Sequence, residues 1–290
     1  MPEILSAHAK INLCLHITGR RADGYHELES LFVPVPGLAD SLEMSPALRG
    51  TGCRVEPALP DCPQERNLVH RAWTAYAKAT GFAPDVLVRL TKRIPTGAGL
   101  GGGSSDAAAM LRWLQGKAGA AALTPSKLNA LAASIGADVP FFLLSGPALA
   151  EGIGEKLTLV ALDLSAFTLV LAMPAAHIST PWAYAAHDAL DPLKNPVSLG
   201  MDGLTSTRTA NKRRVSLSPV VARNDFEVVV FPANGALRVI KEQLFRLGAA
   251  CAVMSGSGAA IAALFRDTGL AQKAAEAVRL NGVTVHVEAL

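Results

Sequence analysis

The chain has 290 residues, of which 50% are hydrophobic, and a formal net charge of +3 at neutral pH. A chain of this length can bury one large core or two of ordinary size. The small positive charge, with no lysine or arginine block beside interleaved aromatics, argues against nucleic acid as a partner. The four cysteines form no CxxC pair, which argues against a structural zinc site and against a disulfide framework.

The N-terminal sequence MPEILSAHAK argues against export. It has an acidic residue where a signal peptide carries positive charge, and its apolar residues alternate with polar ones instead of forming a continuous run. We therefore expect the cysteines to be reduced thiols and the protein to be cytoplasmic.

Residues 7–17 alternate in the pattern of a β-strand. One face contains Ala7, Ala9, Ile11, Leu13, Leu15 and Ile17, and the other contains His8, Lys10, Asn12, Cys14 and His16. An edge or surface strand would alternate in the same way, but such strands more often expose Thr or Glu than Lys and Asn. We therefore expect a polar strand face that lines a site. The Asp23-Gly24 pair that follows is typical of a hairpin turn.

Three segments of the first half show helix signals. Residues 67–81 carry apolar residues at helical spacing and end in a glycine that can stop a helix. Residues 104–115 follow a strand-like run and begin with three candidate N-caps, Ser104, Ser105 and Asp106. The Thr124-Pro125 pair opens a third helix in the order that helix starts favour.

The glycine-broken segment 150–155 indicates a crossing into a second half, so the expected domains are residues 1–152 and 153–290. The second half begins with strand-like runs and ends in strand and helix patterns. Because strands and helices are mixed in both halves, the chain is expected to be a two-domain α+β enzyme.

The uncharged segment 247–265 has two interpretations. Its nineteen residues meet the length of a membrane-spanning helix. Its centre, however, is SGSG, and its flanks are rich in alanine rather than leucine. We favour a strand, a glycine loop and a second strand, and we expect no membrane partner.

Residues 95–106, PTGAGLGGGSSD, contain five glycines between a strand and the start of a helix. An ordinary turn needs one or two glycines, so five indicate that the backbone approaches a ligand closely. The segment contains the G-x-G-x-x-G spacing of a dinucleotide site. However, Lys92, Arg93, Ile94 and Pro95 stand between the apolar strand and the first glycine, and no acidic residue follows at the distance of the ribose contact.

Two other interpretations of the loop fit less well than a phosphate site. A Walker A loop is excluded because GK[ST] does not occur in the chain. A flexible linker would seldom follow a strand and precede a well-capped helix. A phosphate cradle remains, in which backbone N–H groups and the positive end of the next helix bind anionic oxygens. The residues alone leave open which nucleotide is bound.

Segment 95–106 resembles the second motif of the GHMP kinases, the family of galactokinase, homoserine kinase and mevalonate kinase, with the pattern Pro-x-x-x-Gly-Leu-Gly-Ser/Gly-Ser/Gly-Ser. AKINLCLHITGRRADGYHEL (9–28) resembles the first motif as it occurs in members that phosphorylate 4-diphosphocytidyl-2-C-methyl-D-erythritol. MSGSGAAIAALF (254–265) resembles the third motif, and NDFE (224–227) matches a further segment of those members. The glycine loop is specific only to the family, whereas AKINL and RADGYHEL are specific to those members.

The resemblance implies a two-domain GHMP kinase fold. The N-terminal domain would be mixed α/β with a glycine-rich phosphate loop, the C-terminal domain would be ferredoxin-like α+β, and the substrates would lie between them. ATP would be the phosphoryl donor with Mg²⁺, for which Ser104 or Ser105 is a candidate partner. The implied ATP-binding residues are Asn67, near the nucleoside, and the loop residues Pro95, Thr96, Gly97, Ala98, Gly99, Leu100, Gly101, Gly102, Gly103, Ser104 and Ser105.

Two residues match the catalytic positions of the family. Asp138 in GADVP matches the catalytic aspartate, although an aspartate before Val-Pro is, by itself, more often a helix N-cap. Lys10 matches the lysine beside that aspartate and the acceptor oxygen. The lysine would stabilise developing alkoxide charge and keep Asp138 ionised. The alternative for Lys10 is a solvated lysine on a strand.

The resemblance also implies the residues that bind the acceptor. Tyr25 and His26 would contact the cytidine, and Tyr184 would lie on the opposing face of the ring, since flat heterocycles are held by stacking and by hydrogen bonds at the base edge. Asn12 would contact the methylerythritol or its phosphates. The alternatives are that both tyrosines are surface residues and that Trp182 serves in place of Tyr184.

The other histidines show no triad or metal spacing and are expected to be surface or satisfied core residues. These are His70, His177, His187 and His286. SGSG (255–258) is expected to be a backbone turn packed against the active site.

Three alternatives to the implied kinase differ in what they leave unexplained. Another small-molecule GHMP kinase, of the mevalonate or homoserine type, would have no evident use for RADGYHEL. A dinucleotide-dependent oxidoreductase would bind NAD(P)H and would not need Asp138. A nucleotide-binding regulator without catalysis would leave Lys10 and Asp138 without a role. The sequence leaves open whether the protein is a monomer or a homodimer, and it offers no motif for the basic stretch 207–215.

Overall fold

The computed structural model describes residues 2–58, 62–190, 206–209, 212–215 and 222–290. The chain forms two compact units. The first unit contains Met1–Ala9, Pro36–Thr96 and Gly101–Ser145, and the second contains Lys10–Val35, Gly97–Leu100 and Gly146–Leu290. The long strands β1 (Glu3–Arg20) and β2 (His26–Pro46), which pair with each other, contribute residues to both units.

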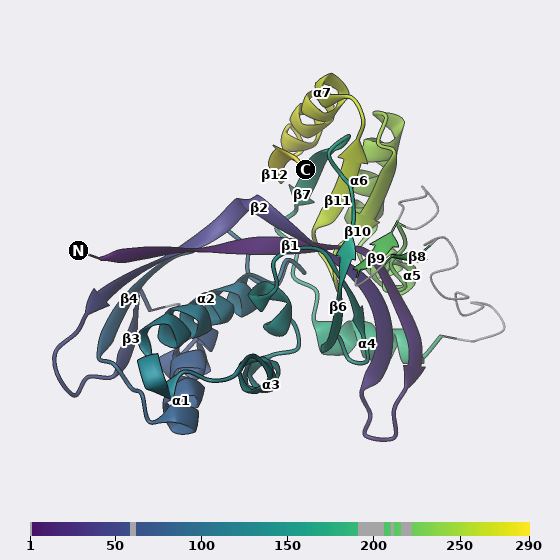
Figure 1. The fold of residues 1–290 in the computed structure, drawn as a ribbon. Helices are drawn as coiled ribbons and strands as arrows, with labels where there is room; N and C mark the ends of the chain where they lie inside the picture. Colours follow the sequence, from purple (N-terminus) through teal and green to yellow (C-terminus); the bar gives the residue numbers. More distant parts are fainter. Residues whose placement is uncertain (1, 59–61, 191–205, 210–211, 216–221) are drawn as a thin grey trace. The chain divides into compact units, whose positions relative to one another are not determined.

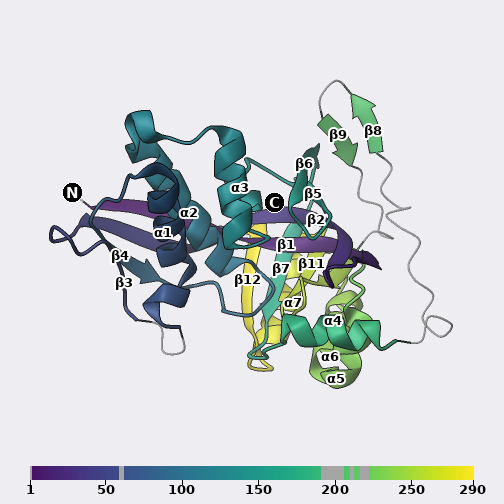
Figure 2. The same cartoon turned by 90° about the horizontal axis from the view of Figure 1, so that it is seen from below.

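Helices pack beside a small group of strands in the first unit. Strand β3 (Cys53–Glu56) pairs in parallel with β4 (Val86–Thr91), and β4 pairs antiparallel with the end of β2. Helix α1 (Leu68–Thr80) packs against β3 and against α2 (Gly102–Lys117) and α3 (Pro125–Ile135), as Figure 2 shows. The 3₁₀ helices are η1 (Gln64–Arg66), η2 (Gly119–Ala121) and η3 (Pro140–Leu143).

The helix signals of the sequence give the right ends for α1 and α3. Gly81 ends α1 in the left-handed region with a φ of 75°. The hydroxyl of Thr124 accepts a hydrogen bond from the amide of Lys127 and caps α3, which has proline in its first turn. Both ends depend on groups within one turn of the helix, so local sequence is sufficient to place them.

The predicted start of α2 is wrong. The helix begins at Gly102, and its N-cap is Gly101, which adopts a φ of 71°. None of the three candidate caps, Ser104, Ser105 and Asp106, occupies the N-cap position. A glycine can enter a helix from the left-handed region without steric cost, so the loop turns into the helix before the polar residues are reached.

The second unit contains a four-stranded antiparallel sheet. Its strands are β7 (Thr168–Met173), β10 (Cys251–Met254), β11 (Ile261–Phe265) and β12 (Thr284–Ala289), in the order β10-β11-β7-β12. Helices α6 (Gly235–Arg246) and α7 (Thr268–Arg279) pack against this sheet (Figure 1). In chain order these elements read β-α-β-β-α-β, so the expected ferredoxin-like arrangement of the second half is confirmed.

Further elements complete the second unit. Strand β5 (Ala148–Glu151) pairs with β2 and with β6 (Lys156–Ala161), and β6 pairs with β9 (Lys212–Val215), which pairs with β8 (Ser206–Thr209). The remaining helices are α4 (Thr180–Asp188) and α5 (Glu227–Ala233).

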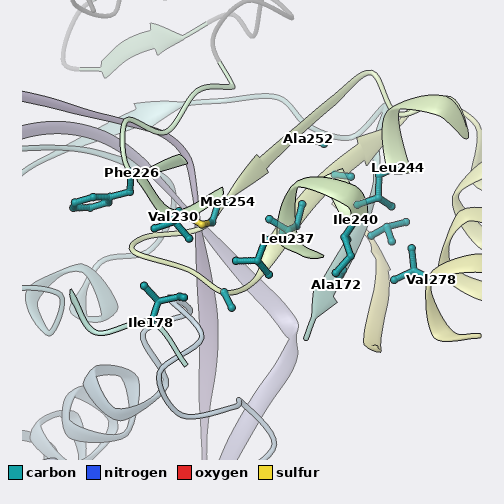
Figure 3. Close-up of a cluster of buried hydrophobic side chains, with 14 of the residues drawn as sticks. Ala172, Ile178, Phe226, Val230, Leu237, Ile240, Leu244, Ala252, Met254 and Val278 are labelled. Carbon is teal, nitrogen blue, oxygen red and sulfur yellow. The ribbon is translucent and has the colours of Figure 1, made fainter. Parts of the chain in front are cut away.

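A hydrophobic core forms between the sheet of the second unit and its helices (Figure 3). Leu237, Ile240 and Leu244 lie at helical spacing on α6 and are buried beside side chains of the sheet. Val278 contributes to the same core from α7. Burial of these apolar side chains is the main favourable contribution to the stability of the unit.

The segment 247–265 contains the two strands that the sequence favours, β10 and β11, joined by a glycine loop. Among the described residues, no helix is long and apolar enough to cross a membrane.

Candidate active site

The polar face of β1 is buried. Lys10 is 3% exposed; its Nζ donates a hydrogen bond to Oδ1 of Asn12 at 2.6 Å and lies 4.6 Å from the centre of the Phe32 ring. Nδ2 of Asn12 donates to the hydroxyl of Ser30 at 2.7 Å. A buried ammonium must be compensated by polar partners, so this lysine has a fixed position. The alternative of a solvated strand lysine is wrong.

The same strand is tied to two glycine loops of the second unit. The amide of Asn12 donates to the hydroxyl of Ser255 at 3.1 Å, and that hydroxyl donates to the carbonyl oxygen of Gly99 at 2.9 Å. The amide of Lys10 donates to the carbonyl oxygen of Leu100 at 3.0 Å. The buried lysine is therefore held next to loop residues 97–100 through both its strand neighbour and its own backbone.

The SGSG segment is a backbone turn packed against the glycine loop. The amide of Ala260, just after the turn, donates to the carbonyl oxygen of Ala98 at 3.1 Å. Asn224, the first residue of NDFE, supports the turn, because its Nδ2 donates to the carbonyl oxygens of Met254 and Gly256, each at 2.7 Å. Three segments that are distant in sequence thus form one loop assembly in this unit.

The predicted hairpin turn is present and places aromatic residues. Gly24 has a φ of 88°, and its amide donates to the carbonyl oxygen of Arg21 at 3.0 Å. Tyr25, next in the chain, is 62% exposed. The ring of His26 stacks on the ring of Tyr184 from α4, with centroids 4.5 Å apart and planes inclined by 15°. Two of the three predicted cytidine contacts therefore lie together, and the third projects into solvent.

In the first unit, Asn67 lies at a cavity. Its Oδ1 caps α1 by accepting a hydrogen bond from the amide of Val69 at 2.9 Å. The cavity has a volume of about 190 Å³, and its described lining residues are Val55, Pro57, Ala58, Cys62, Pro63, Gln64 and Asn67. Within the described ranges, Nδ2 of Asn67 makes no hydrogen bond, which leaves a donor for a ligand.

Asp138 lies in a turn between α3 and η3. The N-cap of η3 is Val139, so the helix-capping alternative for Asp138 is wrong. A Cβ atom added to Gly136 would lie 3.8 Å from Oγ of Ser104, which shows that this turn runs beside the first turn of α2. The predicted base and the end of the glycine loop are therefore neighbours within the first unit.

A buried charge cluster lies beneath the start of α2. Nζ of Lys92 donates to Oδ2 of Asp106 at 2.7 Å and also to a carboxylate oxygen of Asp40. The other oxygen of Asp40 accepts hydrogen bonds from the amides of Arg93 and Ile94, which precede the loop. Burial raises the pKa of Asp106 to about 7, although the charge of Lys92 acts in the opposite direction.

Sequence reasoning missed several of these groups. Ser30 and Asp40 carry no motif of their own, and their partners are far away in sequence. Ser255 lies in the third motif, but its hydrogen bonds with Asn12 and Gly99 were not predicted. The available signal for Lys92 is its place between the end of β4 at Thr91 and the start of the glycine loop at Pro95. None of the four remaining histidines gains a metal-ligand partner in the described part of the chain, where no group of three His, Cys, Asp or Glu side chains could hold a metal ion.

Comparison with known proteins identifies the family. The family model for the GHMP kinases N terminal domain matches residues 67–146, and the model for GHMP kinases C terminal matches residues 211–284. The 4-diphosphocytidyl-2-C-methyl-D-erythritol kinase of Nitratidesulfovibrio vulgaris is 44% identical over 282 residues, which cover 97% of this chain and 96% of the relative. The chain belongs to the GHMP kinase family.

Further relatives support the same grouping. A protein of the same name from Solidesulfovibrio magneticus is 47% identical to this GHMP kinase over 91% of the chain and 88% of the relative. A crystal structure of 4-(cytidine 5'-diphospho)-2C-methyl-D-erythritol kinase has a TM-score of 0.75 and 35% identity, and the match covers 98% of each chain. The homoserine kinase from Cytophaga hutchinsonii shares the fold, with a TM-score of 0.62 at 17% identity over 99% of this chain and 94% of its own.

Membership of the GHMP kinases makes the chain an ATP-dependent small-molecule kinase. It contradicts the alternative of a dinucleotide-dependent oxidoreductase. The G-x-G-x-x-G spacing in residues 97–102 is thus not the fingerprint of a dinucleotide-binding fold, consistent with its distance from the preceding strand.

Proposed function

We propose that this GHMP kinase transfers the γ-phosphoryl group of ATP to the 2-hydroxyl of 4-diphosphocytidyl-2-C-methyl-D-erythritol. The products would be the 2-phosphate and ADP, in the non-mevalonate (methylerythritol phosphate) route to isoprenoid precursors. Relatives with this kinase name match over nearly the whole chain. The structural observation that carries the proposal is the buried ammonium of Lys10, hydrogen bonded to Asn12 and tied through Ser255 to the glycine loop.

The glycine loop and the cavity at Asn67 supply a donor site of the right chemistry. The backbone N–H groups of the glycine loop after Pro95 and the N-terminal end of α2 offer hydrogen bonds and positive potential to the phosphates of ATP. The lining of the cavity beside Asn67 combines apolar side chains with polar groups, among them Gln64, a mixture that suits the nucleoside part of ATP.

We propose that Mg²⁺ binds mainly to the phosphates of ATP. The first turn of α2 would supply one further oxygen ligand, from Ser105. The hydroxyl of Ser105 is buried and makes no hydrogen bond to any described residue, so its oxygen has unused lone pairs. Hydroxyl oxygen fits the preference of Mg²⁺ for oxygen ligands, and the ion in such sites takes most other ligands from phosphates and water. When bound, the ion would neutralise charge on the transferred phosphoryl group.

The acceptor hydroxyl needs a proton acceptor and compensation for the negative charge that develops on its oxygen. We assign the first role to the carboxylate of Asp138 and the second to the ammonium of Lys10. Oδ1 of Asn12 accepts from Lys10 and one N–H of its Nδ2 donates to Ser30, so its main contribution is to orient the lysine. Its predicted contact with the acceptor can use only its remaining Nδ2–H group.

The aromatic residues supply a base-binding surface. Tyr25 is exposed at the hairpin turn, where its ring can stack on a flat heterocycle. His26 offers a ring nitrogen at the base edge, and Tyr184 supports the imidazole by stacking on it. Trp182 is 41% exposed on the first turn of α4 and remains the alternative for the second stacking position.

We also propose that the protein works in the cytoplasm, as a monomer or homodimer, and that residues 1–152 and 153–290 are its two family domains. All four cysteines are free thiols, as a reducing compartment requires. The two family models fall one in each proposed domain.

The test is ADP production with MgATP and 4-diphosphocytidyl-2-C-methyl-D-erythritol, run beside mevalonate, homoserine and galactose. Turnover of the cytidylyl compound alone is expected. Asp138→Ala should lower kcat by about 10²- to 10⁴-fold, the range for loss of a positioned acid or base, while ATP still binds. Turnover of another acceptor would keep the family and reject the substrate, and unimpaired turnover by Asp138→Ala would remove this residue from the mechanism.

A further inference from the structure

A carboxylate that no motif predicts contacts the imidazole of His26. Asp188 is the last residue of α4, and its Oδ1 lies 2.6 Å from Nε2 of His26. Its other oxygen, Oδ2, lies 3.3 Å from Nη1 of Arg20. The two carboxylate oxygens of Asp188 thus contact two different residues. The contact of Oδ1 with the imidazole of His26 is the shorter of the two.

The fold brings these groups together from two elements. Tyr184 and Asp188 are four residues apart on α4, so they lie on the same face of the helix. His26 begins β2 after the hairpin turn. Its ring stacks on Tyr184 while its Nε2 contacts Asp188, so both the plane and the rotation of the imidazole are fixed.

Helix propensity does not explain Asp188. An acidic side chain at the carboxyl end of a helix is disfavoured by the negative end of the helix dipole. The side chain is 29% exposed and gains its two cationic or N–H partners only in the folded chain. A role toward His26 accounts for the residue type at this position.

The contact determines which nitrogen of His26 carries a hydrogen. An ionised carboxylate can only accept hydrogen bonds, so Nε2 must be the donor. In the neutral imidazole Nδ1 then has no hydrogen and is an acceptor. Among the described residues, Nδ1 of His26 has no hydrogen-bond partner, which leaves this acceptor for a ligand.

We infer that Asp188 is a positioning residue that presents Nδ1 of His26 as a hydrogen-bond acceptor, and that this acceptor selects cytosine over uracil in the substrate. The inference rests on the proposed cytidylyl acceptor. The 4-amino group of cytosine donates a hydrogen bond, whereas the 4-oxygen of uracil only accepts, so the same imidazole nitrogen attracts one base and repels the other. With uracil bound, a polar group that is at least half buried would be left without a hydrogen-bond partner. The free energy cost of that loss sets the size of the preference for cytosine.

Asp188→Asn is the informative variant. The amide has nearly the shape of the carboxylate, but it can either accept from Nε2 or donate to it. The variant therefore allows both tautomers of His26 and removes the constraint without emptying the site. Arg20→Gln is the matched control, since it removes the ion pair with Asp188 and leaves the contact with His26; Arg20 is 62% exposed, so the protein should fold normally.

The measurement is the affinity of the full chain for CDP and for UDP by titration calorimetry. We expect wild type and Arg20→Gln to prefer CDP by about tenfold or more, and Asp188→Asn to bind both within about threefold of each other. Thermal unfolding and the affinity for ATP should be unchanged in both variants. In turnover, Asp188→Asn should raise KM for the cytidylyl substrate with kcat within about twofold of wild type, which a general loss of structure would not do.

The outcomes separate the inference from the proposed function. If wild type prefers CDP and Asp188→Asn keeps the preference, Asp188 has no such role, although the cytidylyl acceptor stands. If Arg20→Gln loses the preference as much as Asp188→Asn, the charge of the pair and not the hydrogen bond to His26 is responsible, which also overturns the inference. If wild type binds ATP but does not distinguish CDP from UDP, the inference is overturned, and turnover of the cytidylyl compound decides separately whether the proposed acceptor stands.

Discussion

The carbonyl oxygen of Ser255 fills the space that a side chain at Gly99 would need. A Cβ atom on Gly99 would lie 2.0 Å from that oxygen, and the hydroxyl of Ser255 donates to the carbonyl oxygen of Gly99 at 2.9 Å. Gly99 also has a φ of 77°, which side chains rarely adopt. The two glycine loops, 156 residues apart in sequence, therefore depend on each other for their shape.

We predict that Gly99→Ala distorts the phosphate loop. The new methyl group meets backbone, which cannot rotate away, so the loop or the 255–258 turn must shift. The expected loss of stability is about 2–4 kcal/mol, from backbone strain together with the displaced contact. We expect kcat/KM to fall at least about tenfold, because misplacement of a positioned group by 1 Å can cost more than that. Chemical denaturation and steady-state kinetics measure the two effects.

Gly97→Ala is the control for this variant. Gly97 has nearly the same φ, 73°, but its Cβ would meet the ring of His177, with 2.5 Å to Nδ1. That ring is exposed and can move. Gly97→Ala should therefore show the strain of a positive φ alone, about 1 kcal/mol. Equal losses in the two variants would mean that the contact with Ser255 does not matter.

We predict that Asn12→Ala lowers kcat more than it alters the KM for ATP. The variant removes the Oδ1 atom that accepts the hydrogen bond of Lys10, and the ammonium then loses one of the groups that orient it. A decrease of about 10- to 100-fold in kcat is expected for a loosened catalytic group, with the KM for ATP within about threefold.

Ser30→Ala separates this effect from loss of packing. It removes the partner of Nδ2 of Asn12 and leaves the bond between Lys10 and Asn12. It should cost about 1 kcal/mol of stability, the usual worth of a buried hydrogen bond, with kcat within about threefold of wild type. If Ser30→Ala lowers kcat as far as Asn12→Ala, orientation of Lys10 is not the cause.

Local signals were sufficient for much of the fold. The turn at Asp23-Gly24, the end of α1 at Gly81 and the cap of α3 at Thr124 each depend on residues within one turn. In the second half, hydrophobic patterns predicted strand-like runs at its start and two strands around the SGSG turn, whereas the ferredoxin-like order came from the family resemblance. The residues that we propose for the phosphate loop come from the family motifs.

Contacts between distant segments could not be predicted in the same way. Alternation in β1 predicts a polar face, but it does not reveal that Lys10 and Asn12 are buried, since that depends on what covers the strand. The hydrogen bond between His26 and Asp188 connects a residue at the hairpin turn with one at the end of a helix, 162 residues later in the sequence. Neither residue type nor spacing carries that information in a single sequence.

The side chain of Asn67 has two proposed roles that substitution can separate. Its Oδ1 caps α1, and its Nδ2 is proposed to contact the nucleoside of ATP. Asn67→Ala should lose both, with about 1 kcal/mol of stability and a higher KM for ATP. Asn67→Asp keeps a capping oxygen and removes the donor, so it should keep the stability of wild type and still raise the KM for ATP.

The measurements are denaturant unfolding and the KM for ATP at saturating acceptor. A normal KM for ATP in Asn67→Asp would restrict Asn67 to capping. Cys62, which lines the same cavity, gives an independent check. Alkylation of its thiol should be slowed by ATP if the nucleoside occupies this cavity, and an unchanged rate would place the nucleoside elsewhere.

The last prediction concerns the pH dependence of stability. Burial raises the pKa of Asp106 to about 7 in the folded protein, whereas an unfolded aspartate titrates near about 3.9. Between these values the folded chain holds a proton that the unfolded chain has lost. The stability that Asp106 contributes is therefore fully present below about pH 4, decreases by at most about 1.4 kcal/mol per pH unit as pH rises, and levels off above about pH 7.

Asp106→Asn should remove this dependence, because the amide does not titrate and Lys92 keeps its contact with Asp40. Other carboxylates and histidines titrate in the same range, so the quantity to compare is the difference in unfolding free energy between variant and wild type from pH 4 to pH 8. We expect that difference to shift in favour of the variant as pH rises to about 7 and then to become constant. A difference that shifts toward wild type with rising pH would mean that the ion pair with Lys92 outweighs the cost of burying the carboxylate.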